Sequence, residues 1–196
     1  MSSITSSALY ELALNTNIQE RLFRELSESL DSLDPDSEEY LEVVMNKLPY
    51  LDCVIKETLR KYPVLARLER RLGVEKYNLG KQSIPLTKNQ LVEISVIALH
   101  YNPEIYPEPF RFDPERFAPE NKHLLVPHSF IPFGDGPRNC LGMRFAYQEM
   151  KLCLSRILSR YRFLPTDNTP RQLTFLPFKF VLISEPYPLQ VIKREN

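Results

Sequence analysis

Apolar residues recur every three or four positions along much of the chain, which is the spacing of one face of an α-helix. The clearest stripe lies between residues 18 and 30. We expect its helix to begin at Asn17, because Glu20 stands three residues later, as in a capping box. The members of this stripe are Ile18, Leu22, Phe23, Leu26 and Leu30. Similar spacing predicts helices over 4–14, 37–46, 51–62 and 96–101, and a last helix that ends near residue 160.

Shorter apolar runs predict three strands, over 67–72, 77–79 and 91–95. The tail over 173–193 predicts a β-hairpin that turns at residues 185–188. Five prolines crowd the segment 103–119, and proline removes the backbone donor that regular elements need, so we expect an ordered but irregular meander there. Its apolar anchors would be Ile105, Tyr106, Phe110, Phe112 and Phe117. Helices dominate without a βαβ repeat, so the expected fold class is mainly α with small β-sheets (α+β).

Charge is balanced over the chain, with 25 basic and 25 acidic residues, so no basic excess is present to attract nucleic acid or an anionic membrane. A length of 196 residues is enough for one domain with a hydrophobic core. Residues 1–5 show no basic region or cleavage site, and no apolar stretch is long enough to span a bilayer. We therefore expect neither a signal peptide nor a membrane segment in this chain.

The three cysteines, Cys53, Cys140 and Cys153, form no C-x-x-C pair, so their spacing argues against a zinc or iron–sulfur site. Cys53 and Cys153 lie in helical patterns and are expected to be inert core thiols. Cys140 lies in the glycine-rich stretch 133–142, directly before a helix-forming run.

The setting of Cys140 favours a thiolate that binds a metal. A helix N-terminus and the neighbouring Arg138 both lower the pKa of a thiol, and glycines let the backbone approach a flat, bulky group. Arg138 can also pair with an acidic group on such a ligand. Haem, a soft-ligand metal cofactor with carboxylates, fits these features. The alternative is a glycine loop that contains a buried cysteine and no ligand.

Glu57 and Arg60 form E-x-x-R on the helix that Pro63 ends, and helical geometry lets side chains three apart touch. Both residues lie away from the apolar stripe of that helix. Periodicity by itself therefore favours a solvated surface pair, which would contribute little to stability.

Five residues of the cysteine stretch match the order F-x-x-G-x-R-x-C-x-G: Phe133, Gly136, Arg138, Cys140 and Gly142. With E-x-x-R upstream and Pro114-Glu115-Arg116-Phe117 between, the chain resembles the cytochrome P450 family of haem-thiolate monooxygenases. The resemblance implies that Cys140 ligates the iron of haem b and that Phe133 covers the thiolate side. It makes Arg70 and Arg138 candidates for the haem propionates. It also implies that Arg116 joins Glu57 and Arg60 in a buried ion network.

The resemblance extends to animal microsomal members, which include detoxifying oxygenases and thromboxane synthase, through the stretches 67–70, 77–80 and 142–146. It implies insertion of one oxygen atom from O2 into an apolar substrate, with electrons from NADPH through a reductase. It also implies an endoplasmic-reticulum membrane location for the parent protein. Two groups of residues would border the substrate pocket, with ordinary packing as the equal alternative: Val64, Leu65, Ala66 and Arg67, and Leu182, Ile183 and Ser184.

The chain is less than half the length expected of this family, and by its motifs Met1 falls within the family's long central helix. We therefore expect residues 1–196 to be a single incomplete haem-binding domain, the C-terminal portion of the fold, that is inactive alone. Two other readings stay open: an isomerase or synthase that rearranges a peroxide, and a non-catalytic truncated remnant. The three histidines, His100, His123 and His128, have no ligand-like spacing, and the sequence assigns them no role.

Overall fold

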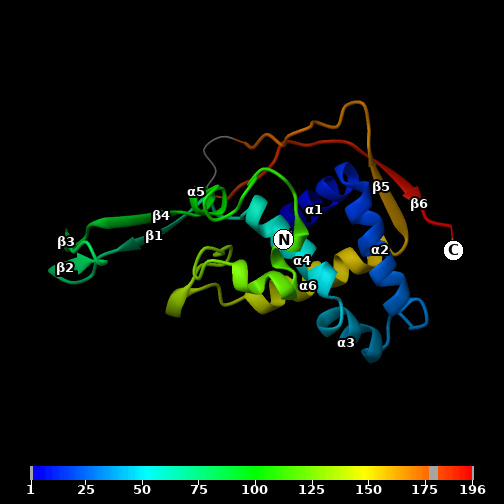
Figure 1. The fold of residues 1–196 in the computed structure, drawn as a ribbon, viewed down its shortest axis with the longest axis horizontal. Coiled ribbons are helices and arrows are strands. Elements are labelled where there is room, and N and C mark those ends of the chain that lie inside the picture. The colour runs from blue at the N-terminus through cyan, green and yellow to red at the C-terminus, as the bar shows by residue number, and fades with distance from the viewer. Residues whose placement is uncertain (1, 177–180, 196) are drawn as a thin grey trace.

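The computed structural model describes residues 2–176 and 181–195. Its main body is a group of helices, with two short β-sheets to one side and a third sheet on another (Figure 1). The α-helices are α1 (Ser2–Leu14), α2 (Thr16–Leu30), α3 (Glu38–Asn46), α4 (Pro49–Lys61), α5 (Val96–His100) and α6 (Met143–Leu158). No helix in this part of the chain is long and apolar enough to cross a bilayer.

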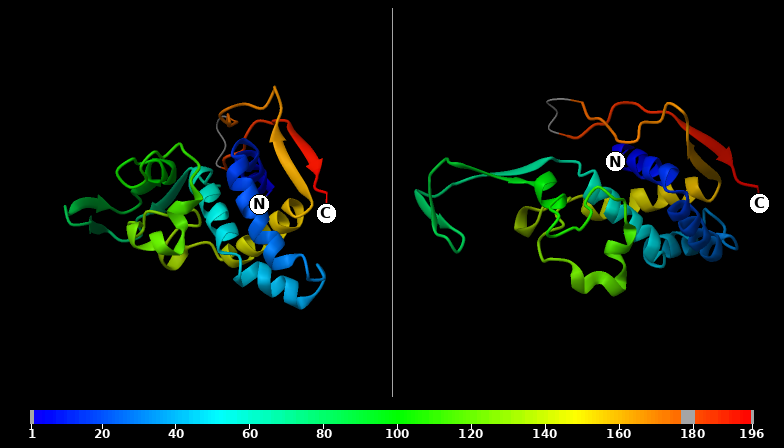
Figure 2. Two further views of the ribbon diagram at one scale, coloured as in Figure 1. Left: turned by 45° about the vertical axis from the view of Figure 1, so that its right-hand side comes forward. Right: turned by 45° about the horizontal axis from the view of Figure 1, so that its top comes forward.

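Three antiparallel two-stranded sheets complete the α+β fold that the sequence predicts. Their strands are β1 (Arg67–Arg71) with β4 (Leu91–Ser95), β2 (Lys76–Leu79) with β3 (Ile84–Thr87), and β5 (Tyr161–Pro165) with β6 (Leu189–Lys193). The first two sheets form an arm that projects away from the helices (Figures 1 and 2). Strand β3 is not predicted by the sequence pattern, because Pro85 interrupts it.

Helix α4 runs through the centre of the core. Leu51, Val54, Ile55 and Leu59 are at most 1% exposed, and each such side chain contributes roughly 1.5–3 kcal/mol by leaving water. The polar side of the helix is buried as well, because Glu57 and Arg60 are 0% exposed. Asp52 and Lys56 are the partly exposed residues near the middle of the helix, whereas the side that carries Glu57 and Arg60 is covered, which places those two charges inside the protein.

The β5–β6 sheet is tied to the junction of α1 and α2 by Gln19. Its amide nitrogen donates to the carbonyls of Leu12 at 2.9 Å and Phe163 at 2.8 Å, and its amide oxygen accepts the Phe163 N–H at 2.8 Å. Gln19 is 1% exposed, and all of these bonds are buried. One side chain therefore provides hydrogen-bond partners for the buried N–H and carbonyl of Phe163 on β5, which water does not reach.

The predicted hairpin over 173–193 is wrong in its pairing. Strand β6 pairs with β5, with Phe163 opposite Val191. Within the predicted hairpin, the described residues that pair with each other are 174–176 and 183–185. The predicted turn at 185–188 therefore begins at the end of that pairing and leads into β6. Residues 177–180 of the predicted hairpin lie outside the described residues. An alternating pattern identifies a strand but does not choose its partner, and here the partner is distant in sequence.

The predicted cap of α2 is also wrong. Asn15 precedes the helix and Asn17 lies inside it, because a single residue joins α1 to α2. The Asn15 amide donates back to the Glu11 carbonyl at 2.8 Å instead of capping. The start of α3 agrees with the sequence, since the Ser37 hydroxyl accepts the Tyr40 N–H at 3.1 Å.

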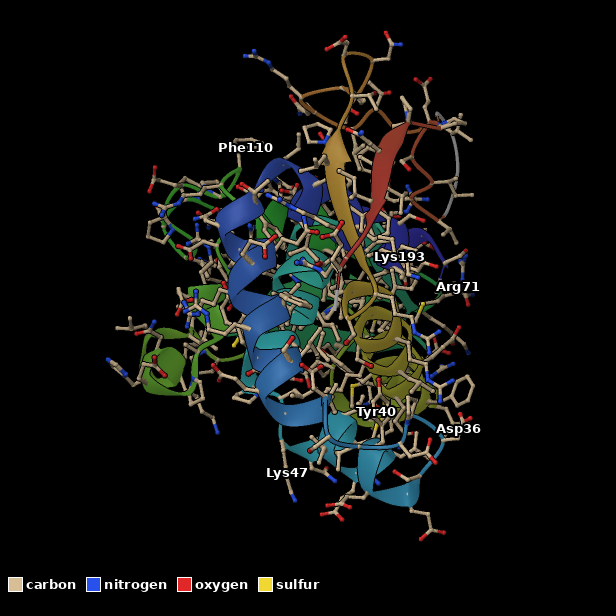
Figure 3. All side chains as sticks on the ribbon, turned by 90° about the vertical axis from the view of Figure 1, so that its right-hand side faces the viewer. Asp36, Tyr40, Lys47, Arg71, Phe110 and Lys193 are labelled. Atoms are coloured by element: carbon tan, nitrogen blue, oxygen red, sulfur yellow. The ribbon has the colours of Figure 1, made fainter. Side chains whose placement is uncertain are left out.

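Helix α3 is joined to α6 through Arg156. Its guanidinium lies 3.0 Å from the Asp36 carboxylate and 5.9 Å from the centre of the Tyr40 ring. Asp36 and Tyr40 both lie at the α3 end of the molecule (Figure 3). The ion pair is exposed and the ring lies near the limit of cation–π distance, so each contact contributes about 1 kcal/mol or less.

The proline-rich meander is more regular than expected. Two 3-10 helices, η1 (Pro114–Phe117) and η2 (Pro119–Leu124), each begin with a proline, and a proline costs nothing at the first helical position because the N–H there has no helical partner. Tyr106, Phe112 and Phe117 are buried as predicted. Phe110 is 68% exposed, so it does not anchor the meander in the core.

Candidate functional site

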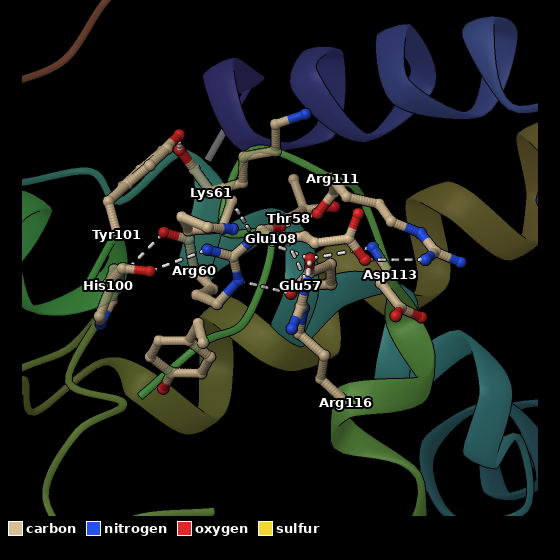
Figure 4. Close-up of polar contacts among 12 residues, drawn as sticks. Glu57, Thr58, Arg60, Lys61, His100, Tyr101, Glu108, Arg111, Asp113 and Arg116 are labelled. Carbon is tan, nitrogen blue, oxygen red and sulfur yellow. Dashed lines mark hydrogen bonds and ion pairs between the residues drawn. The ribbon is translucent and has the colours of Figure 1, made fainter. Parts of the chain in front are cut away.

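A buried ion pair lies at the C-terminal end of α4 (Figure 4). Arg60 Nε donates to Glu57 Oε2 at 2.7 Å, and Arg60 Nη2 donates to Glu57 Oε1 at 2.8 Å. Two parallel bonds between a guanidinium and a carboxylate are the strongest geometry for such a pair. The expectation of a solvated surface pair is wrong, because the meander covers the polar side of α4.

Arg60 also binds two backbone carbonyls. Its Nη1 donates to the His100 carbonyl at 2.8 Å, and its Nη2 donates to the Pro109 carbonyl at 2.9 Å. The guanidinium therefore joins α4 to the end of α5 and to the meander, two segments that are far away in sequence.

Arg116 of η1 reaches the same carboxylate (Figure 4). Its Nε lies 3.5 Å from Glu57 Oε1, an ion pair rather than a hydrogen bond, and its Nη2 donates to the Glu108 carbonyl at 3.0 Å. The Asp113 N–H donates to the same Glu57 oxygen at 3.0 Å. The structure thus brings together all three residues of the expected network, Glu57, Arg60 and Arg116.

Burial and pairing act against each other in this cluster. Burial raises the pKa of Glu57, and the hydrogen bonds from Arg60 and Asp113 oppose that rise. Burial alone would lower the pKa of Arg60, but the hydrogen bond and charge of Glu57 together outweigh burial, so the pKa is raised. Removal of one partner would leave the other charge buried and unpaired, at a cost of about 3–5 kcal/mol.

The cysteine stretch forms a closed loop in front of α6. The Cys140 N–H donates to the Phe133 carbonyl at 2.8 Å, and the Gly134 N–H donates to the Ile131 carbonyl at 3.0 Å. Gly134 and Gly136 adopt φ of +78° and +75°, a left-handed conformation that favours glycine. The Phe133 ring packs 5.5 Å from that of Tyr147 on α6. The loop is therefore held by its own backbone and by one aromatic contact with the helix that follows.

The loop presents its thiol at the surface. Cys140 is exposed, Leu141 is fully exposed and Phe145 is 70% exposed. The alternative of a buried cysteine without a ligand does not agree with this exposure. Among residues 2–176 and 181–195, no group of three or more His, Cys, Asp or Glu side chains is placed to hold a metal ion.

A family model described as Cytochrome P450 matches residues 1–191. The chain belongs to the cytochrome P450 family. It is 38% identical over 195 residues to cytochrome P450 3A31 of Mesocricetus auratus, which covers 99% of this chain and 37% of that protein. It is 42% identical over 181 residues to the probable cytochrome P450 6a14 of Drosophila melanogaster, and this match covers 92% of this chain and 35% of that protein. The chain thus spans little more than a third of the length of these relatives.

The loop fits the haem that this family implies. A Cβ added at Gly136 or Gly142 would meet no atom within 4 Å, so open space lies directly beside the backbone there. The exposed apolar groups of Leu141 and Phe145 lie on the same segment as the exposed Cys140 thiol. A flat apolar group with a thiolate-binding metal can use all of these features.

The two arginines that the sequence proposes for the propionates are both exposed. Arg138 lies in η3 (Gly136–Arg138) and forms no ion pair within the described part of the chain. Arg70 donates to the Glu69 carbonyl at 2.7 Å. Its strand is next to the loop, because a Leu68 methyl lies 3.8 Å from a Cβ placed on Gly134. Leu68 and Arg70 share one face of β1, since side chains two apart point the same way.

The expected substrate-pocket residues come together only in part. The Leu182 N–H donates to the Val64 carbonyl at 2.9 Å, and Leu65 forms a bridge with Val181. The remaining four residues of the two groups bond elsewhere: Ala66 to the start of α5, Arg67 to Glu69 and Glu93, Ile183 to Leu176, and Ser184 to Phe175.

A cavity of about 710 Å³ lies beside this bridge, and Leu182 is the one residue of the expected pocket that lines it. Most of its wall is apolar or aromatic, with Tyr62, Tyr101 and Phe175 among the lining residues. The predicted pocket and the cavity therefore coincide at one side chain.

His100 is the residue of this site that the sequence analysis missed. It is 0% exposed, and both of its ring nitrogens are hydrogen-bonded. A single histidine in an apolar run shows no spacing from which a role could be read. The one local indication was its position between an apolar helical turn and a proline-rich segment. Only the tertiary contacts show that its ring is hydrogen-bonded to Arg60 and Ile131.

Proposed function

We propose that this chain carries the haem-binding site of a haem-thiolate monooxygenase, with Cys140 as the ligand of the iron of haem b. The observation that carries the proposal is the exposed Cys140 thiol on a glycine loop closed by its own N–H bond to Phe133. An exposed thiol is open to oxidation, and the exposed apolar side chains of Leu141 and Phe145 beside it favour aggregation. A bound cofactor would cover both the thiol and these side chains.

Each residue of the loop has a part in holding the group. Cys140 supplies the sulfur, Gly136 and Gly142 leave room for the ring, and Phe133 shields the side of the loop that packs on α6. Arg138 and Arg70 offer to the propionates exposed guanidinium groups that form no ion pair among the described residues. When bound, haem supplies the oxygen chemistry.

The buried network gives the loop its support. Glu57, Arg60 and Arg116 join α4 to the meander over 103–119, and the chain then passes through η2 to Ile131 at the base of the loop. Because these charges are buried, the loss of any member leaves another charge unpaired and weakens the attachment of the meander to α4.

We further propose that a longer parent protein inserts one oxygen atom of O2 into an apolar substrate. Its electrons would come from NADPH through a reductase, and its location would be the endoplasmic-reticulum membrane. Membership of the cytochrome P450 family supports the monooxygenase class of this reaction. The backbone bond between Val64 and Leu182 supports a pocket border formed by those two segments. For the present chain we propose a single, incomplete haem-binding domain over residues 1–196.

Haem titration of the chain tests the proposal. The wild type is expected to take up haem and, after reduction with dithionite and addition of carbon monoxide, to show a thiolate-type absorption spectrum. Cys140→Ser is expected to lose that spectrum, because a hydroxyl does not replace a thiolate ligand. Cys153→Ser on α6 is the matched control and is expected to keep it. An unchanged spectrum in Cys140→Ser would overturn the assignment.

A further inference from the structure

His100 lies beside Arg60 of the ion network (Figure 4), and the hydrogen bonds of its ring define its protonation state. Its Nδ1 is 3.0 Å from the Arg60 carbonyl, which can only accept, so Nδ1 carries the proton. Its Nε2 accepts the Ile131 N–H at 3.1 Å, so Nε2 is unprotonated. The ring is therefore a neutral imidazole with a single tautomer.

His100 is bound to Arg60 in both directions. Its ring donates to the Arg60 carbonyl, and its own carbonyl accepts from Arg60 Nη1 at 2.8 Å. The ring is stacked on Phe130 at 5.7 Å and meets Tyr106 edge-on at 6.4 Å. The side chain is thus fully enclosed and has one orientation relative to α4.

The other ring nitrogen reaches the base of the loop. The Ile131 N–H binds His100, the Ile131 carbonyl accepts from Gly134, and the Phe133 carbonyl accepts from Cys140. These three hydrogen bonds follow one another along a short stretch of chain. They lead from the imidazole to the backbone of the cysteine.

We propose that His100 is a positioning residue, whose imidazole holds the Cys140 loop in register with the network of Glu57, Arg60 and Arg116. That His100 holds the loop in place depends only on hydrogen bonds within this chain. Its consequence for haem rests on the proposed function above.

Two variants test the two hydrogen bonds of the His100 ring separately. Asparagine places its amide nitrogen near the position of Nδ1, so His100→Asn retains the donor to Arg60 and loses the acceptor for Ile131. Glutamine is one bond longer and places its oxygen near the position of Nε2, so His100→Gln retains the acceptor for Ile131. The two variants are matched in chemistry and differ in which bond they keep.

Amide hydrogen exchange of the chain provides the measurement. His100→Asn is expected to speed exchange of the Ile131 amide by about tenfold, the effect of one lost hydrogen bond, and His100→Gln is expected to restore slow exchange. Equal exchange at Ile131 in both variants would overturn the proposal.

A measurement on the wild type decides the proposal even where a variant does not fold. Nitrogen-15 spectra of the imidazole are expected to show a protonated Nδ1, an unprotonated Nε2 and a coupling from Nε2 to the Ile131 amide. A proton on Nε2 would overturn the proposal.

Haem titration of the same variants tests the consequence for the cofactor. The thiolate-type spectrum is expected to be weaker in His100→Asn than in His100→Gln, and equal spectra in the two would overturn this consequence. A wild type that takes up no haem would overturn the proposed function instead, while the exchange data would still decide the role of His100.

Discussion

Acid is expected to destabilise the protein through His100. Burial lowers the pKa of this side chain from its ordinary 6.5 to about 4, because the enclosed ring has no water to solvate a charge. In the unfolded chain the same imidazole binds a proton near pH 6.5. Between about pH 6.5 and pH 4 the imidazole is therefore protonated in the unfolded state and neutral in the folded state. The free energy of unfolding falls as the pH falls through this range.

The size of the effect follows from the two pKa values. The difference of roughly 2.5 pH units, at 1.36 kcal/mol per unit, corresponds to about 3 kcal/mol. This contribution is fully present above pH 6.5 and is lost by about pH 4. It is a large share of the roughly 5–15 kcal/mol that stabilises an ordinary domain.

Urea unfolding, followed by circular dichroism at pH 7, 6, 5 and 4.5, measures this loss. The wild type is compared with His100→Gln, which has no titrating ring and keeps the acceptor for Ile131. The groups that face His100 are Arg60, Tyr106 and, through Arg60, Glu57, and all are common to both proteins. The difference in unfolding free energy between the two is expected to change by about 2.5 kcal/mol from pH 7 to pH 4.5, to the disadvantage of the wild type. A difference that stays constant over this range would refute the reasoning.

Three further substitutions are expected to lower the free energy of unfolding, each for a different physical reason. Glu57→Ala leaves the Arg60 charge buried and unpaired, so it is expected to lower the unfolding free energy by about 3–5 kcal/mol and to abolish haem uptake; a loss below about 1 kcal/mol would contradict the network. Ser37→Ala removes the cap of α3 and is expected to cost about 1 kcal/mol in urea unfolding, whereas Ser37→Asp would retain most of it. Gly136→Ala meets no neighbouring atom but adopts φ of +75°, so backbone strain alone is expected to cost about 1–2 kcal/mol; Gly136→Asn is the control, and an equal loss there would count against strain as the cause.

Much of the local structure could be predicted from the sequence. The stripe that ends at Leu30 and the start predicted at Ser37 mark real helix boundaries, because periodicity and capping act within about one turn of the chain. The two 3-10 helices η1 and η2 were not predicted, because the prolines indicated an irregular meander there. The candidate ligand Cys140 was also found from its own neighbours, since glycines and an arginine around one thiol form a local pattern. The pairing of β6 was not found, because the choice of a strand partner depends on residues far away.

By itself, the sequence determined the helix-rich character of this protein, its cysteine loop and its family, since each depends on residues that are close together along the chain. The periodicity of α4 did not show that Glu57 and Arg60 are buried, which only the family resemblance implied. The tertiary structure decided it, because the meander that covers them begins more than 40 residues later. It also decided the role of His100, which the sequence shows as one histidine among three. Burial is a property of the segments that pack around a side chain, and a local pattern contains no record of them.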